Sequence, residues 1–343
     1  MRNSQTGQEF QYGGQAVIEG VMMRSPRFFA VACRRQNKEI VLQQESVESL
    51  FKKFQWLNKP FLRGTLAVID ALVLGMKSLT FSANVAMEDT QQPNPKKGKQ
   101  STAGTGSADP EAPQDPQGQP AKTKHQAVND IAIGVTLFLG IALGLGVFVV
   151  GPRLLVGLMR KSVHHSVLLN LMTGGVKLIL LVAYIAAISL MADIRRVFEY
   201  HGAEHKVINT FEAGMELTPE NFSKHTAIHP RCGTSFIMVF VVASILVFCL
   251  LGWSSIWLRV VQELALLPVV AGVAYEAIRY AGRHKDSKAL NVLLAPGLWL
   301  QRLTTREPTD DQVEVALCAL RAVMEMERAN SRQPVVGSAG CSA

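Results

Sequence analysis

The stretch DIRRVFEYHGAEHKVINTFE, residues 193–212, decides how this chain folds, and it follows directly on an apolar run at 167–191. In a helix each residue turns by about 100°, which puts the apolar residues of 193–212 on one face. His201 and His205 fall on that same face, with Glu204 at its edge. The pattern predicts a helix that leaves an apolar span and buries two histidines and a carboxylate.

Two histidines four residues apart on a helix can bind one metal ion. His201 and His205 form the pattern H-x-x-E-H, the order found in inverted zinc peptidases. Glu204 is the candidate general base, because it lies where it could take a proton from a water on that metal. A bound cation would also offset the cost of burying this carboxylate. The alternative is a pair of core histidines bonded to backbone, with Glu204 paired to a cation.

Gly202 interrupts this motif. A glycine inside a helix costs about 1 kcal/mol relative to alanine. We expect either that the helix is not straight at this point or that another segment packs closely against it.

The composition of the chain indicates a membrane protein. Of its 343 residues 48% are hydrophobic, the mean hydropathy is +0.17, and four apolar spans are near the length that crosses a bilayer. These spans lie roughly at 131–150, 167–191, 233–251 and 260–281. A further apolar helix at 61–86 contains three charged residues, so we expect it to be interfacial or tightly packed, although a fifth span is possible.

The distribution of lysine and arginine predicts an orientation in the membrane. The connections between the spans alternate between more and fewer cations, which favours both termini and the H-x-x-E-H segment on the cytoplasmic side. The net charge of +8 then fits anionic lipids, so the lipid bilayer is the expected partner. No nucleic-acid motif is present, and we expect no nucleic-acid partner. The five scattered cysteines form no C-x-x-C pair and are expected to be reduced.

The predicted fold class is mainly α: a multi-pass membrane protein with about four transmembrane helices, a small α+β N-terminal cytosolic block and a C-terminal cytosolic helix. The block, 1–88, combines short strands at 13–24, 28–34 and 39–44 with the apolar helix. A disordered linker at 89–125 precedes the membrane domain, 126–307. A capping box, Thr309 with Gln312, begins an amphipathic helix at 308–330, and 331–343 is a tail.

A catalytic zinc usually takes three protein ligands and leaves a position for water. His229 and Cys232 lie just before the third span, and Glu276 lies at the same end of the fourth. Chain direction therefore brings all three to one membrane level, beside the H-x-x-E-H helix. We predict that His201, His205 and Glu276 hold the metal, with His229 next.

Each additional ligand has an alternative explanation. Glu276 could pair with Arg279 on the same helix, and His229 could simply precede a turn. Cys232 could be a soft ligand, a nucleophile or an inert buried thiol. Glu212 continues the histidine stripe and is a possible ligand or support for one, whereas His225 is more typical of a loop histidine.

These segments resemble the YqhQ-like family of uncharacterised bacterial membrane proteins, which are described as predicted metal-dependent enzymes. The resemblance runs through six motifs and covers nearly the whole chain outside the linker. It implies a multi-pass protein of the bacterial cytoplasmic membrane with a metal site, but no substrate. Glu19, in the first motif, becomes a candidate lining residue of the site; the alternative is a plain turn residue. The motifs are GGQAVIEGVMMR (13–24), LRG (62–64), YHGAEHKVINTFE (200–212), HPRCGTSF (229–236), YEAIR (275–279) and LQRLTTREPTDDQVEVAL (300–317).

The sequence leaves two functions open. One is a metal-dependent hydrolase at the cytoplasmic membrane face, acting on a membrane protein or a lipid-linked group. Its divalent metal would be zinc first, or manganese or iron if the third ligand is a carboxylate. The other is a non-enzymatic metal-binding scaffold or a transporter, for which only Lys177, Glu263 and Glu276 provide charges within the spans.

Overall fold

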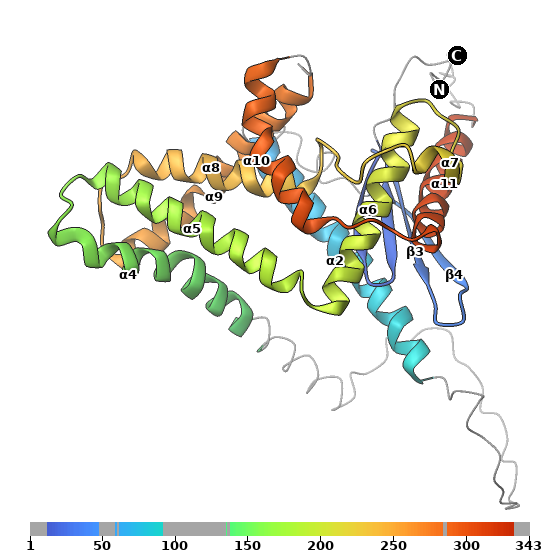
Figure 1. Ribbon diagram of the computed structural model, residues 1–343, viewed down its shortest axis with the longest axis horizontal. Helices are drawn as coiled ribbons and strands as arrows, with labels where there is room; N and C mark the ends of the chain where they lie inside the picture. Colours follow the sequence, from blue (N-terminus) through green and yellow to red (C-terminus); the bar gives the residue numbers. More distant parts are fainter. Residues whose placement is uncertain are drawn as a thin grey trace, which may run out of the picture.

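A computed structural model describes residues 12–47, 59, 62–91, 135, 138–283 and 287–332. The described part is mainly helical with one small antiparallel sheet, as predicted. Figure 1 shows two regions side by side, a bundle of long helices and a sheet covered by helices. The expected linker beyond residue 91 and the expected tail beyond residue 332 lie outside the described residues.

The sheet has four antiparallel strands in sequential order: β1 (Gly13–Val17), β2 (Gly20–Arg24), β3 (Phe28–Arg34) and β4 (Ile40–Ser46). The prediction of short strands in these segments is confirmed. β1 and β2 form a tight hairpin whose turn includes Glu19 at φ +50°.

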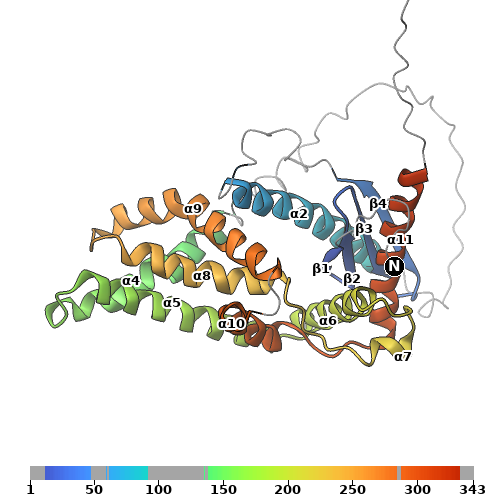
Figure 2. The same ribbon diagram turned by 90° about the horizontal axis from the view of Figure 1, so that it is seen from above.

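This sheet is the middle one of three layers. Successive side chains of a strand point to opposite faces, so β2 and β3 supply apolar side chains to both sides. One face packs against α6 (Ala192–Glu212) and α11 (Asp310–Arg332), and the other packs against α2 (Leu62–Gln91). Figure 2 shows the strands between these helices. Segments from the beginning, middle and end of the chain therefore share one core.

The bundle is built from α4 (Gly151–Gly157) with its flanking turns, α5 (Ser166–Ile188), α8 (Gly233–Cys249) and α9 (Ile256–Arg283). Among the described residues four helices are long and apolar enough to cross a membrane: Leu62–Asp89, Phe138–Lys161, Ser166–Ile188 and Ile256–Ala281. This set differs from the predicted one, because α8 has only 17 residues and α2 is long enough. The number of candidate spans is four, as expected.

The first span extends beyond its predicted end at residue 150. A π-helical turn (Gly146–Val150) leads into α4, and a 3₁₀ turn (Leu158–Lys161) ends the helix. Arg153, which lies beyond that predicted end, is therefore inside the helix and almost fully buried. Its guanidinium donates to the carbonyl of Ser254 and lies over the ring of Trp253. These partners let the helix continue through a charged residue.

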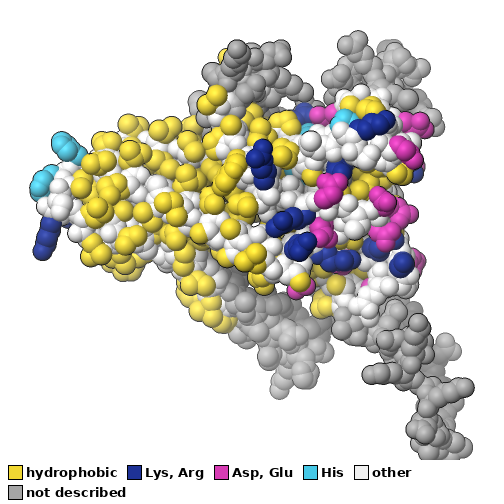
Figure 3. Space-filling model, in the orientation of Figure 1, with side chains coloured by type: hydrophobic (Ala, Val, Ile, Leu, Met, Phe, Trp, Pro, Cys, Tyr) yellow, Lys and Arg dark blue, Asp and Glu magenta, His cyan; other side chains and the backbone are white. Residues whose placement is uncertain are grey.

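The surface divides in the same way as the fold. Figure 3 shows hydrophobic side chains over the bundle and charged side chains over the sheet region. Large apolar side chains of the bundle are highly exposed, such as Leu158 at 80% and Trp257 at 83%. Soluble proteins rarely expose apolar surface this extensive, so the bundle is compatible with a lipid environment.

The sequence did not reveal α10 (Lys288–Thr304), which packs on α8. From its end the chain runs along α6 before α11 begins. The main-chain N–H of Arg306 donates to the carbonyl of Phe198 at 2.9 Å. The predicted amphipathic helix is confirmed as α11, and the Gln312 side chain accepts from the N–H of Thr309 at 2.9 Å, as in a capping box.

Gly202 is where this connecting segment touches α6. A Cβ atom at Gly202 would lie 2.0 Å from the carbonyl oxygen of Arg306. The expected close approach at this glycine is thus confirmed, and α6 remains an unbroken helix through it.

We predict that Gly202→Ala destabilises the protein by about 2 kcal/mol or more, because the main chain at Arg306 must move. Thermal unfolding of the detergent-purified protein, followed by circular dichroism, measures this. The matched control is Gly175→Ala in α5, where a Cβ meets nothing within 4 Å and alanine is favoured by about 1 kcal/mol. Equal melting temperatures for the two variants would contradict the close contact.

Candidate metal centre

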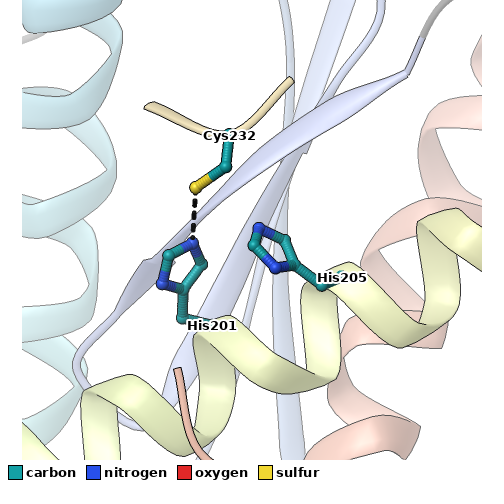
Figure 4. Close-up of side chains that lie close together, drawn as sticks. All are labelled: His201, His205 and Cys232. Carbon is teal, nitrogen blue, oxygen red and sulfur yellow. Dashed lines mark hydrogen bonds between the residues drawn. The ribbon is translucent and has the colours of Figure 1, made fainter. Parts of the chain in front are cut away.

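His201 and His205 lie one turn apart on α6. Cys232, the residue immediately before α8, faces them (Figure 4). Nε2 of His201 is 3.1 Å from Sγ of Cys232. One potential ligand atom from each of the three residues lies within 4.8 Å of the other two. His205 and Cys232 are buried, so the three side chains form a largely enclosed group.

Main-chain carbonyls fix the tautomer that each imidazole adopts when it is neutral. Nδ1 of His201 is 2.8 Å from the carbonyl oxygen of Thr304, and Nδ1 of His205 is 2.6 Å from that of Ala227. A carbonyl oxygen can only accept, so each Nδ1 carries the hydrogen and each neutral ring keeps a lone pair on Nε2. This is how proteins orient histidines that bind metals. Burial lowers the pKa of His205, which also favours its neutral form.

Cys232 occupies the N-cap position of α8. The N–H of Thr234 donates to its Sγ at 3.4 Å, and the Thr234 hydroxyl lies 3.2 Å from the same sulfur. The N-terminus of a helix favours a negatively charged group. The position is therefore suited to a cysteine that acts as a thiolate ligand.

Two side chains hold the loop that carries Ala227, His229 and Cys232. Asn209, one turn beyond His205 on α6, donates to the carbonyls of Thr226 and Ile228 at 2.9 and 3.0 Å. Gln301 of α10 is fully buried; it accepts from the N–H of His229 at 2.9 Å and donates to its carbonyl at 2.8 Å. The loop is thus anchored on both sides of the site.

Glu204 is buried between α6 and β1, and the N–H of Gly14 donates to its carboxylate. A Cβ at Gly14 would come within 2.9 Å of the glutamate side chain, so glycine allows this approach. Burial raises the pKa of Glu204, while nearby His201 and His229 act in the opposite direction. The carboxylate therefore lies close to His201 and His229, and a bound cation there would stabilise its charged form.

His229 packs beside this group. Its ring centroid is 5.7 Å from that of His205, and its Nδ1 accepts from the N–H of Arg231. Its buried Nε2 has no hydrogen-bond partner among the described residues and lies 3.5 Å from Glu212, which also pairs with Arg231. His229 is thus a further histidine beside the group, and Glu212 lies within ion-pair distance of it.

The other predicted candidates lie elsewhere. The carboxylate of Glu276 accepts two hydrogen bonds of 2.5 Å from Arg63 of α2, so this glutamate joins α9 to α2. Glu19 accepts from Arg196 and from the hydroxyl of Tyr200, which ties the β1–β2 turn to α6. The third member of the compact group is therefore Cys232 and not Glu276.

Comparison with known proteins identifies relatives. Residues 59–326, which include the whole candidate centre except the strand residues, match the family model described as "Protein of unknown function (DUF1385)". The chain is 34% identical over 322 residues to "Uncharacterized protein YqhQ" of Bacillus subtilis (strain 168), covering 92% of this chain and 93% of that protein. No solved structure matches significantly.

We predict that Gln301→Leu destabilises the protein by about 2 kcal/mol, because it leaves the buried N–H of His229 without its partner and removes one of the two hydrogen bonds to the His229 carbonyl. Thermal unfolding by circular dichroism measures the loss. Arg302→Leu, at the exposed neighbouring position of α10, is the control and should change the melting temperature little. If both variants melt like the wild type, Gln301 does not anchor the loop.

Proposed function

The chain belongs to the DUF1385 family of proteins of unknown function, and from that premise we propose that it is a membrane-bound, metal-dependent hydrolase. One observation carries the proposal. The lone pairs on Nε2 of His201 and His205 and the sulfur of Cys232 come together, with both imidazole tautomers set by main-chain carbonyls. A purely structural histidine pair needs no such convergence.

The ligand types favour zinc. Two imidazoles and a thiolate suit zinc, whereas carboxylate and carbonyl oxygens suit magnesium, calcium and manganese. The expectation of manganese or iron depended on a carboxylate third ligand, and Glu276 is engaged with Arg63. Three protein ligands leave one position for water or substrate, as in catalytic zinc sites.

Zinc in such a site supplies a Lewis acid that makes a water ligand acidic near neutral pH. We assign proton removal from the attacking water to Glu204, the one carboxylate of the motif. His201 and His205 are held in their ligand tautomers throughout by Thr304 and Ala227. Glu204 must be ionised to act as a base, and a nearby cation favours that form.

We place the centre at the membrane surface. α6 begins four residues after α5 ends, and α8 begins directly after Cys232, so two bundle helices lead to the site. A substrate that is itself in the membrane, such as a membrane protein or a lipid-linked group, would reach it there. The positive-inside pattern supports a cytoplasmic site in the cytoplasmic membrane of a bacterium, with both termini on the same side.

We expect the purified wild-type protein to hold about one zinc ion per chain, measured by inductively coupled plasma mass spectrometry after zinc repletion. His205→Ala should lose nearly all of it, because a ligand is removed. Glu204→Gln should retain it, because Glu204 is assigned to the proton and not to the metal. The matched control is His225→Ala, whose imidazole lies beside Met215 away from the centre. Zinc retained in His205→Ala, or absent from the wild type, would refute the site.

A fourth variant, His229→Ala, tests the non-enzymatic alternative. His229 lies beside His205 and could serve as a fourth ligand. A structural zinc site is usually closed by four protein ligands. If His229→Ala also loses the metal, the site is closed and the protein is better described as a metal-binding scaffold. Full retention of zinc in this variant supports an open, catalytic coordination position.

Zinc should also protect Cys232 from alkylation. In the zinc-loaded protein we expect iodoacetamide at pH 8 to leave Cys232 largely unmodified, and chelation to increase its labelling at least about tenfold, because a metal-bound thiolate is withheld from the reagent. Peptide mass spectrometry quantifies each site. Cys33 is an internal control, since burial raises its pKa to about 12 and it should stay unmodified in both states. Labelling of Cys232 that ignores the chelator would argue against a thiolate ligand.

A further inference from the structure

A second cluster of largely buried charges lies in the helix bundle, whose α4 helix lies at the end remote from the sheet (Figure 1). It consists of Arg153 of α4, Lys177 of α5, and Arg259 and Glu263 of α9. Arg153 is 3% exposed and Arg259 2% exposed, although both lie in helices that are long and apolar enough to cross a membrane. None of these residues contributes to the metal centre.

Glu263 carries the only negative charge in this cluster, and it is shared by two cations. Nζ of Lys177 donates to both of its oxygens at 2.7 Å, and Nε of Arg259 donates to one of them at 3.1 Å. The sequence has no other aspartate or glutamate at 138–192 or 233–275. Three cations against one carboxylate leave two positive charges without compensation.

Arg153 has no acidic partner among the described residues. One side of its guanidinium donates to the carbonyl of Ser254 and its plane lies 4.0 Å above the ring of Trp253, while Arg259 lies 4.7 Å above the ring of Phe248. Nη1 of Arg153 and Nη1 of Arg259 are both buried with no hydrogen-bond partner in the described structure. Each arginine therefore keeps a buried donor that no described group uses.

Such an arrangement is costly unless something negative binds to it. A buried charge without a partner costs several kcal/mol, and charged residues within membrane segments generally mark functional sites. Aromatic rings hold the two guanidinium planes but cannot neutralise them. Guanidinium groups bind phosphate and carboxylate through pairs of parallel hydrogen bonds. The missing component is an anion with several acceptor oxygens.

We propose that Arg153, Lys177 and Arg259 form a binding site for a phosphate group, positioned by Glu263 and covered by Trp253 and Phe248. Basic pockets between membrane helices bind phospholipid head groups in this way. The phosphate could belong to an anionic phospholipid or be free in solution, and the chemistry of recognition is the same.

The test uses the full-length protein purified in a non-ionic detergent. Native mass spectrometry compares the binding of phosphatidylglycerol with that of zwitterionic phosphatidylcholine, and thermal unfolding is measured with and without inorganic phosphate. We expect either a preference of at least about tenfold for phosphatidylglycerol, or a rise in melting temperature with phosphate that sodium chloride of equal ionic strength does not produce. The first result identifies a lipid head group as the source, and the second a free anion.

Variants tie the effect to the cluster. Arg153→Gln should abolish whichever response the wild type shows, and Arg153→Lys should weaken it, because lysine keeps the charge but loses the fork of donors. Arg160→Gln is the matched control, since Arg160 is an exposed arginine at the same end of the bundle and its loss should change nothing. A response that survives in Arg153→Gln, or that is lost equally in Arg160→Gln, would overturn the proposal.

The wild type alone also decides the matter if Arg153→Gln fails to fold. Equal binding of the two lipids together with no phosphate-specific rise in melting temperature would refute the site. Loss of zinc in any of these variants is not expected, so the outcome is independent of the metal centre.

Discussion

Two main-chain carbonyl groups orient the two histidines of the candidate metal centre. The carbonyls of Thr304 and Ala227 accept the Nδ1 hydrogens of His201 and His205, which leaves both Nε2 atoms free to act as ligands. Each of these hydrogen bonds would be lost if the segment that carries the carbonyl moved. The end of α10, the loop before α8 and the middle of α6 must therefore hold fixed positions relative to one another, and much of the surrounding structure serves that requirement.

Helix α6 helps to fix these positions because its different faces contact different parts of the structure. Ala203 and Val207 join the core against the sheet and α11, while His201 and His205 point toward Cys232. Gly202 lets the segment after α10 approach to contact distance, which brings Thr304 within reach of His201. Asn209 then holds the loop of Ala227 from the same helix. One helix thus links the stability of the sheet region to the geometry of the candidate centre.

Local patterns in the sequence predicted much of this. Helical periodicity placed both histidines on one buried face, and glycine-bounded apolar segments indicated the strands, because both signals depend only on neighbouring residues. The close packing at Gly202 was also foreseen. The third member, Cys232, was only one of several candidate ligands, because the order of spans brings Glu276 and Cys232 to a similar level. The choice between them depends on Arg63, more than two hundred residues away, which binds the glutamate. Likewise, no local pattern shows which carbonyl will face a histidine.

The buried charges of this protein also depend on partners that are distant in the sequence. Arg63 and Glu276 form a complete bidentate pair, so neither charge requires anything further. Glu204 and the cluster around Arg153 are different, because burial leaves each with a charge that the described protein groups offset only in part. The two sites have opposite signs, and they lie at opposite ends of the bundle. A carboxylate beside two imidazoles and a thiol favours a cation, whereas two arginines and a lysine around a single glutamate favour an anion. Whether a buried charge has a partner of opposite sign within the protein, more than its proximity to a motif, distinguishes residues that stabilise the fold from residues that could bind a ligand.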